Sequence, residues 1–147
     1  MAAEVIARGG ASVTVYDRMP SVGRKFLMAG KSGLNITHSD PFEVFVSRYG
    51  KRRGQIEPLL KNFGVKELRD WVHSFGIETF VGTSGRVFPV GMKASPLLRA
   101  WLKRLIASNV TFHLRHKLTG ILPGNTLHFL TPDGEVTVKA DAVILAG

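Results

Sequence analysis

The first twenty residues contain a helix end and a strand that ends in an acidic residue, and this order restricts the fold more than any other feature. Residues 1–8 have the apolar spacing of a helix, and Gly9-Gly10 is typical of a helix stop because glycine accepts a left-handed backbone. Residues 12–17 alternate, with Val13 and Val15 on one face, which predicts a strand that ends at Asp17. A helix that leads directly into such a strand favours an α/β fold.

The middle of the chain is predicted to be mainly helical, after a glycine-rich loop over residues 28–35. Apolar residues recur at positions i, i+3, i+4 and i+7 from Leu68, and Gly76 supplies a stop. Short strands are expected at residues 77–81 and 87–88. Ser95-Pro96 is a helix start, because serine caps free N–H groups and proline needs no N–H there. Trp71 and Trp101 lie on apolar stripes and are expected in the core.

The last third is predicted to be rich in strands. Residues 110–114 alternate, residues 118–122 and 127–130 are further strands, and Pro132-Asp133-Gly134 is a turn. Residues 142–146 are continuously apolar, as expected of a strand buried on both faces of a parallel sheet. We therefore expect a single α/β domain over residues 1–147, with a parallel sheet, flanking helices and a three-stranded antiparallel excursion near residues 110–138.

Composition limits the classes of protein to consider. The chain has 147 residues, an apolar fraction of 44% and no cysteine, so it suits one globular domain without disulfides or thiolate metal sites. No stretch is long and apolar enough to span a bilayer, and residues 1–8 lack the pattern of a signal peptide. We expect a cytoplasmic protein with no membrane association. The five histidines show no metal-ligand spacing, and no serine lies in a nucleophile elbow.

The net charge of +9 keeps a second class of function open, a basic nucleic-acid-binding module. Its basic residues, however, are dispersed along the chain, and the aromatic residues lie on apolar stripes instead of alternating with them. Any binding to DNA or RNA is therefore expected to be non-specific and to weaken steeply with salt.

Asp17 is the first candidate functional residue. In dinucleotide-binding units, an acidic residue at this strand end accepts hydrogen bonds from the ribose hydroxyls of the adenosine half, about 20 residues beyond a glycine motif. Counting back from Asp17 places that motif before Met1, so we expect the first strand and its G-x-G-x-x-G loop to lie upstream of this sequence. The alternative is that Asp17 only forms the turn at the strand end.

Two glycine-rich segments form a second group of candidates. They consist of Gly23-Arg24-Lys25 and of Gly30-Lys31-Ser32-Gly33 with Asn35. Glycines let backbone N–H groups approach an anion or a ring closely, and the basic side chains suit a diphosphate. The alternative is a solvated surface loop. A third segment, Gly85–Pro89 followed by Lys93–Pro96, fits either an arginine held near a ligand or a plain turn between strands.

Taken together, these segments resemble a known family. Residues 13–37, VTVYDRMPSVGRKFLMAGKSGLNIT, and residues 76–95, GIETFVGTSGRVFPVGMKAS, are similar to motifs of the BaiN-like flavoproteins, which are aminoacetone-oxidase-type FAD-binding enzymes. The ending DAVILAG resembles the buried strand that leads into the second flavin-contacting turn of that family. The three motifs occur in the family order and cover nearly the whole chain.

The resemblance implies a role for each matching residue. Asp17 would hold the adenosine ribose, and the diphosphate and ribityl chain would lie near Arg18, Gly23, Arg24 and Lys25. The flavin ring would be lined by Gly30, Lys31, Ser32, Gly33 and Asn35. Leu118, in a strand beginning at Arg115, would meet the adenine through its backbone, and Ala146 and Gly147 would approach the flavin. Lys31 and His38 are the residues considered for proton transfer, because both neighbour the flavin loop.

The function implied is FAD-dependent oxidation or reduction of a small organic substrate, with either oxygen or NAD(P)H as the electron partner. Many relatives have arginine and cysteine before the loop asparagine, where this chain has Gly33-Leu34, which indicates a distinct subfamily. The substrate domain of the family is expected downstream of Gly147. We therefore expect these 147 residues alone to be an inactive part of the enzyme. A flavoprotein remnant without activity is a further alternative, and the oligomeric state stays open.

Overall fold

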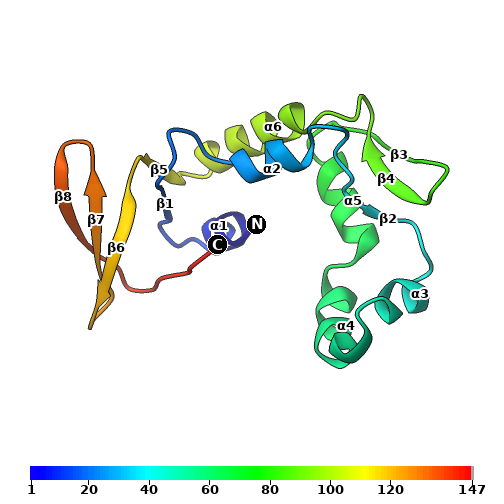
Figure 1. The fold of residues 1–147 in the computed structure, drawn as a ribbon, viewed down its shortest axis with the longest axis horizontal. Coiled ribbons are helices and arrows are strands. Elements are labelled where there is room, and N and C mark those ends of the chain that lie inside the picture. Colours follow the sequence, from blue (N-terminus) through cyan, green and yellow to red (C-terminus); the bar gives the residue numbers. More distant parts are fainter. Residues whose placement is uncertain (147) are drawn as a thin grey trace. The chain divides into compact units, whose positions relative to one another are not determined.

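The structure is a computed structural model that describes residues 1–146 and divides into two compact units. Unit 1 contains residues 1–22 and 103–147, and unit 2 contains residues 23–102. Figure 1 shows the elements of both units in sequence colours. Helix α6 (Ala94–Ala107) begins in unit 2 and ends in unit 1. No helix among the described residues is long and apolar enough to cross a membrane.

Unit 1 is built around two parallel strands, β1 (Thr14–Asp17) and β5 (Thr111–Leu114). Their register places Asp17 opposite Leu114, so both strands end at the same edge. Helix α1 (Ala2–Arg8) precedes β1, and the side chain of Glu4 is buried there, 2.7 Å from Arg8 Nη2 and 3.3 Å from Arg104 Nη1. The α/β class expected from the sequence is confirmed by this parallel pairing next to a helix.

The rest of unit 1 is a three-stranded antiparallel meander in the order β6-β7-β8. Its strands are β6 (Lys117–Leu122), β7 (Thr126–Thr131) and β8 (Gly134–Lys139). The predicted excursion thus exists but does not include residues 110–114, which pair with β1 instead. The predicted strand start at Arg115 is wrong, because Arg115 has a left-handed backbone with φ of 56° and β6 begins at Lys117.

The predicted buried strand over residues 142–146 is also wrong. These residues form no regular element, and Ile144 and Leu145 are 61% and 70% exposed. A strand requires a neighbouring strand for its backbone N–H and C=O groups. Among the described residues, none provides that pairing for residues 142–146.

Unit 2 packs five helical segments and a small antiparallel sheet. The helical segments that lie wholly within it are α2 (Arg24–Ala29), α3 (Phe42–Ser47), the 3₁₀ turn η1 (Gly50–Arg52), α4 (Arg53–Asn62) and α5 (Val65–His73). The sheet has the order β2-β4-β3, with β2 (Thr37–His38), β3 (Thr79–Val81) and β4 (Arg86–Pro89). Helix α2 was not predicted, and its last two residues, Met28 and Ala29, lie in the segment that was expected to be a glycine-rich loop.

The core of unit 2 lies between α5, the first part of α6 and the segment that follows α2. Leu34, Val72, Ala94 and Leu97 are its buried centre. Trp71 contacts Trp101 edge to face at 4.9 Å between ring centroids. The helical stripe that begins at Leu68 therefore packs as its spacing predicts, and both tryptophans contribute to packing.

The tip of the β3–β4 hairpin depends on Gly85, which has φ of 76° and lies against the ring of His38. A Cβ atom at this position would lie 2.4 Å from His38 Cε1. The ring has little freedom to move, because its Nε2 donates to the Ser84 carbonyl at 2.9 Å and its Nδ1 lies 3.2 Å from Asp40 Oδ2.

Replacing Gly85 with Ala is expected to lower the free energy of unfolding by roughly 2–4 kcal/mol, from left-handed strain and overpacking together. Gly76→Ala is the matched control, because Gly76 has φ of 72° but nothing within 4 Å of its added Cβ. That variant should lose only the strain, about 1–2 kcal/mol. Urea unfolding of both variants measures the difference in the free energy of unfolding. Equal losses would show that the His38 ring moves away from the added methyl without cost.

Candidate functional site

The segment that follows α2 carries the predicted glycine loop and is fixed in place by close backbone packing. Gly30 is buried, and a Cβ atom there would lie 2.4 Å from Ala94 Cβ at the start of α6. The backbone N–H of Leu34 donates to the Met92 carbonyl at 2.8 Å, and that of Ile36 to the Val87 carbonyl at 2.8 Å. The loop therefore has one defined path across the β4–α6 connection.

This path forms one wall of a hollow of about 550 Å³ in unit 2. The residues that line it are Gly30, Lys31, Ser32, Gly33, Phe80, Gly91, Met92 and Lys93. Four of the predicted flavin-loop residues are thus brought together, whereas Asn35 is exposed outside this set. The hollow is lined by two lysines and by no carboxylate, so it attracts a negatively charged group.

Two of the lining residues have a backbone N–H group without a backbone acceptor in the described part of the chain. Among the described residues, no backbone carbonyl accepts from the N–H of Ser32 or Lys93. Free N–H groups beside glycines can bind an anion or the polar edge of a ring. The lining thus combines two ammonium groups with an apolar side formed by Phe80 and Met92.

The opposite wall contains an unusual backbone. Gly91 and Met92 both have left-handed conformations, with φ of 82° and 57°. Left-handed residues other than glycine are uncommon, and strain of this kind gathers at binding and active sites. The side chain of Met92 lies against Gly33, where a Cβ atom would approach Met92 Cε to 2.7 Å. Glycine at position 33 is favoured by its own φ of 134°, whereas the flexible end of Met92 could move away from an added Cβ.

The family comparison identifies this domain. The model of the HI0933-like protein Rossmann domain matches residues 1–147. The chain belongs to this HI0933-like family. The family is of the FAD-binding oxidoreductase type, which agrees with the cofactor and the reaction class expected from the sequence. No curated protein matches the chain.

In the HI0933-like domain, the predicted residue Asp17 lies at the end of a strand. Asp17 ends β1, where its Oδ1 accepts the Met19 N–H at 2.9 Å and its carbonyl accepts the His116 N–H at 3.0 Å. Asp17 therefore does form the turn at the end of the strand. Its Oδ2 has no hydrogen-bond partner among the described residues, and the neighbouring Arg18 is exposed.

Other predicted residues of the HI0933-like domain are exposed as well. Arg24 and Lys25 form the first turn of α2, which Gly23 introduces with φ of 73°. Leu118 lies in β6 opposite Phe129, next to a bulge before Gly120. Ala146 is exposed in the irregular segment, and Gly147 lies outside the described residues.

The structure separates the two residues considered for proton transfer. Lys31 lines the hollow, but His38 does not. His38 is held by Ser84 and Asp40, and Asp40 is also paired with Arg48. Nδ1 of His38 lies 3.2 Å from Asp40 Oδ2 without forming a hydrogen bond with it. Since both ring nitrogens face groups of the fold, His38 has a structural role here.

Sequence reasoning missed Phe80, Gly91 and Met92 as lining residues of the hollow. The sequence segment that includes Lys93 fitted either an arginine held near a ligand or a plain turn, and the sequence alone did not decide between them. Arg86 is exposed on β4 and does not line the hollow. The one signal for the missed wall was Gly91, because the backbone of the β4–α6 connection depends on a left-handed residue there.

The contact between Gly30 and Ala94 can be tested by a double-mutant cycle. Gly30→Ala should lower the free energy of unfolding by roughly 1–3 kcal/mol, because the added methyl overlaps that of Ala94. Ala94→Gly should cost about 1 kcal/mol through helix propensity. The double variant should be more stable than the sum of the single effects by about 1 kcal/mol or more. Strict additivity in urea unfolding would contradict the close approach.

Proposed function

We propose that this domain binds FAD within an oxidoreductase of the BaiN-like, aminoacetone-oxidase type, acting on a small organic substrate. The observation that carries the proposal is the hollow around Gly30–Gly33, with two lysines, free backbone donors and no carboxylate. A flavin ring presents an apolar face and an edge of carbonyl and nitrogen acceptors, and it gains negative charge on reduction. The side formed by Phe80 and Met92 suits the face, and the donors suit the edge.

Each candidate residue has a defined task in this proposal. Gly30, Lys31, Ser32 and Gly33 line the ring, with Asn35 adjoining them in sequence. Arg18, Gly23, Arg24 and Lys25 hold the diphosphate and ribityl chain, and Asp17 Oδ2 accepts from a ribose hydroxyl. Leu118 offers its backbone to the adenine, and Ala146 and Gly147 approach the flavin. Bound FAD supplies the electron transfer, with oxygen or NAD(P)H as the partner.

The side chains of the protein contribute binding and electrostatic stabilisation. The ammonium groups of Lys31 and Lys93 favour electron density on a group bound in the hollow, because opposite charges attract each other. Within the glycine loop, Lys31 is the side chain that lines the hollow and can carry a proton. His38 has no such part in this proposal, since it does not line the hollow and its Nε2 donates to the Ser84 carbonyl.

The first test is a titration with FAD, followed by quenching of flavin fluorescence and by visible absorbance. It uses the 147-residue chain and, in parallel, the protein with any in-frame coding sequence that flanks it. The sequence contains no G-x-G-x-x-G motif, so we expect the flanked form to bind tightly and the chain alone weakly. Absence of FAD uptake by both forms would reject the proposal. FAD uptake without turnover of any substrate would favour the inactive remnant.

The second test separates the two roles of Asp17. Asp17→Asn keeps an oxygen for the Met19 N–H but replaces the free acceptor with a donor, whereas Asp17→Ala removes both. Both variants should bind FAD roughly tenfold to a hundredfold more weakly, the value of a hydrogen bond to a charged group. Urea unfolding should show a stability loss mainly for Asp17→Ala. Unchanged FAD affinity in Asp17→Asn would leave Asp17 as a turn residue alone.

A further inference from the structure

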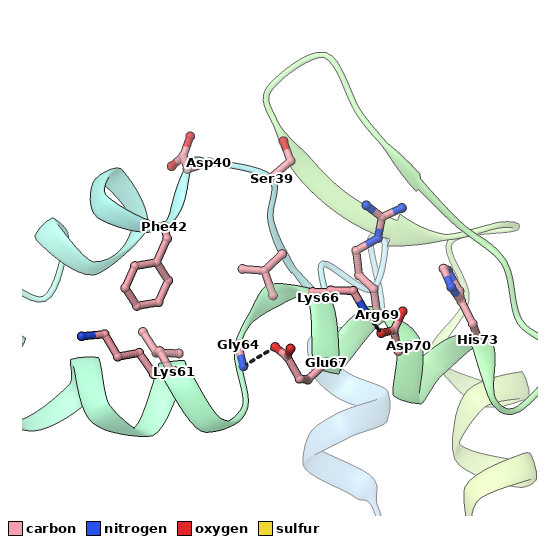
Figure 2. A pocket seen from close by; sticks show the side chains of 12 residues that line it. Ser39, Asp40, Phe42, Lys61, Gly64, Lys66, Glu67, Arg69, Asp70 and His73 are labelled. Atoms are coloured by element: carbon pink, nitrogen blue, oxygen red, sulfur yellow. Dashed lines mark hydrogen bonds and ion pairs between the residues drawn. The ribbon is translucent and has the colours of Figure 1, made fainter.

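A second hollow of about 640 Å³ lies elsewhere in unit 2, between the β2–α3 connection and the helices α4 and α5. It is lined by Ser39, Asp40, Phe42, Leu60, Lys61, Gly64, Val65, Lys66, Glu67, Arg69, Asp70 and His73. Figure 2 shows these side chains from close by. None of them belongs to the glycine-loop hollow or to the residues proposed to hold FAD.

Most charges of this hollow are already paired. Lys66 Nζ contacts Asp70 Oδ2 at 2.5 Å, and this hydrogen bond holds the pKa of Asp70 below its ordinary value. Lys61 pairs with Glu57 at 2.8 Å, outside the lining set. Asp40 is paired with Arg48, as described above.

The remaining carboxylate has a structural task. Glu67 Oε2 accepts the backbone N–H of Gly64 at 2.9 Å and so caps the start of α5. Its position at the first turn also complements the positive end of the helix. The cap thus holds Glu67 at the start of α5 through one of its two carboxylate oxygens.

Arg69 is the lining cation whose end is free. Its Nε donates to Thr79 Oγ1 at 3.0 Å, and the same hydroxyl lies 2.8 Å from His73 Nε2. These contacts fix the orientation of the guanidinium, while its two terminal amino groups have no acceptor among the described residues. In Figure 2 the guanidinium of Arg69 points away from the carboxylates of Glu67 and Asp70. A fixed guanidinium loses little freedom when it binds an anion.

The surroundings of Arg69 select the kind of anion. A guanidinium matches a carboxylate with two parallel hydrogen bonds. Three carboxylates line the same hollow, and they repel a group with two or more negative charges more than one with a single charge. Phe42, Leu60 and Val65 give the hollow an apolar wall, which favours a ligand with an apolar body.

We propose that this hollow binds a monocarboxylate with an apolar body, such as a medium-chain fatty acid, with its carboxylate on Arg69 and its chain against Phe42, Leu60 and Val65. The proposal does not rest on FAD binding. It assigns Arg69 as the anchor and Thr79 as the residue that positions it.

The test is calorimetric titration of the purified 147-residue chain with octanoate and with octanamide, its neutral analogue. Octanoate should bind saturably with one site per chain. Octanamide should bind at least about tenfold more weakly, because it lacks the negative charge. Inorganic phosphate should not displace octanoate. Equal binding of the two analogues, displacement by phosphate, or no saturable binding would overturn the proposal.

Variants locate the site. Arg69→Gln should weaken octanoate binding at least about tenfold, and Arg69→Lys should lose part of the affinity because a single ammonium replaces the planar fork. Arg99→Gln is the matched control, since Arg99 is exposed on α6 and outside the hollow. Circular dichroism and urea unfolding establish that each variant is folded. Wild-type affinity in Arg69→Gln would show that octanoate binds elsewhere and would refute the assignment.

Discussion

The candidate site depends on the close approach of Gly30 to Ala94, where two segments of unit 2 meet without a side chain between them. Because Gly30 is buried against the start of α6, the chain that leaves α2 turns directly into the core, and Leu34 reaches a position that is 5% exposed. The hydrogen bond from Leu34 to Met92 then fixes the opposite wall. Lys31, Ser32 and Gly33 are left between these two anchored points, and this placement makes them the lining of a hollow.

The two hollows of unit 2 differ in charge although both contain lysines. In the glycine-loop hollow, Lys31 and Lys93 have no carboxylate among the lining residues, so an anion entering it meets a surplus of positive charge. In the hollow beside α5, the lysines are neutralised by Asp70 and Glu57, and the free positive charge is confined to Arg69. The number of basic residues alone therefore says little about binding, because the pairing of each residue decides which anion the surface accepts.

The parts of this structure that could be predicted from the sequence are those whose partners are local. The stripe that begins at Leu68, the strand that ends at Asp17 and the packing of Trp71 all follow from spacing within a few residues. The segment 142–146 was mispredicted, because an apolar run becomes a strand only when another strand pairs with it. The wall formed by Phe80 and Met92 could not be predicted either, since it depends on two consecutive left-handed residues and on a hairpin distant in sequence from the loop.

The structural role of Asp17 leaves room for the functional role that is proposed for the same side chain. The sequence left a turn former and a ribose acceptor as alternatives, as if one excluded the other. A carboxylate has two oxygens, however, and the turn uses Oδ1 alone. The bond to the Met19 N–H restricts the rotation of the side chain and so fixes the direction of Oδ2. An acceptor held in this way has less entropy to lose on binding a hydroxyl, so the turn is compatible with the ribose contact proposed for Asp17.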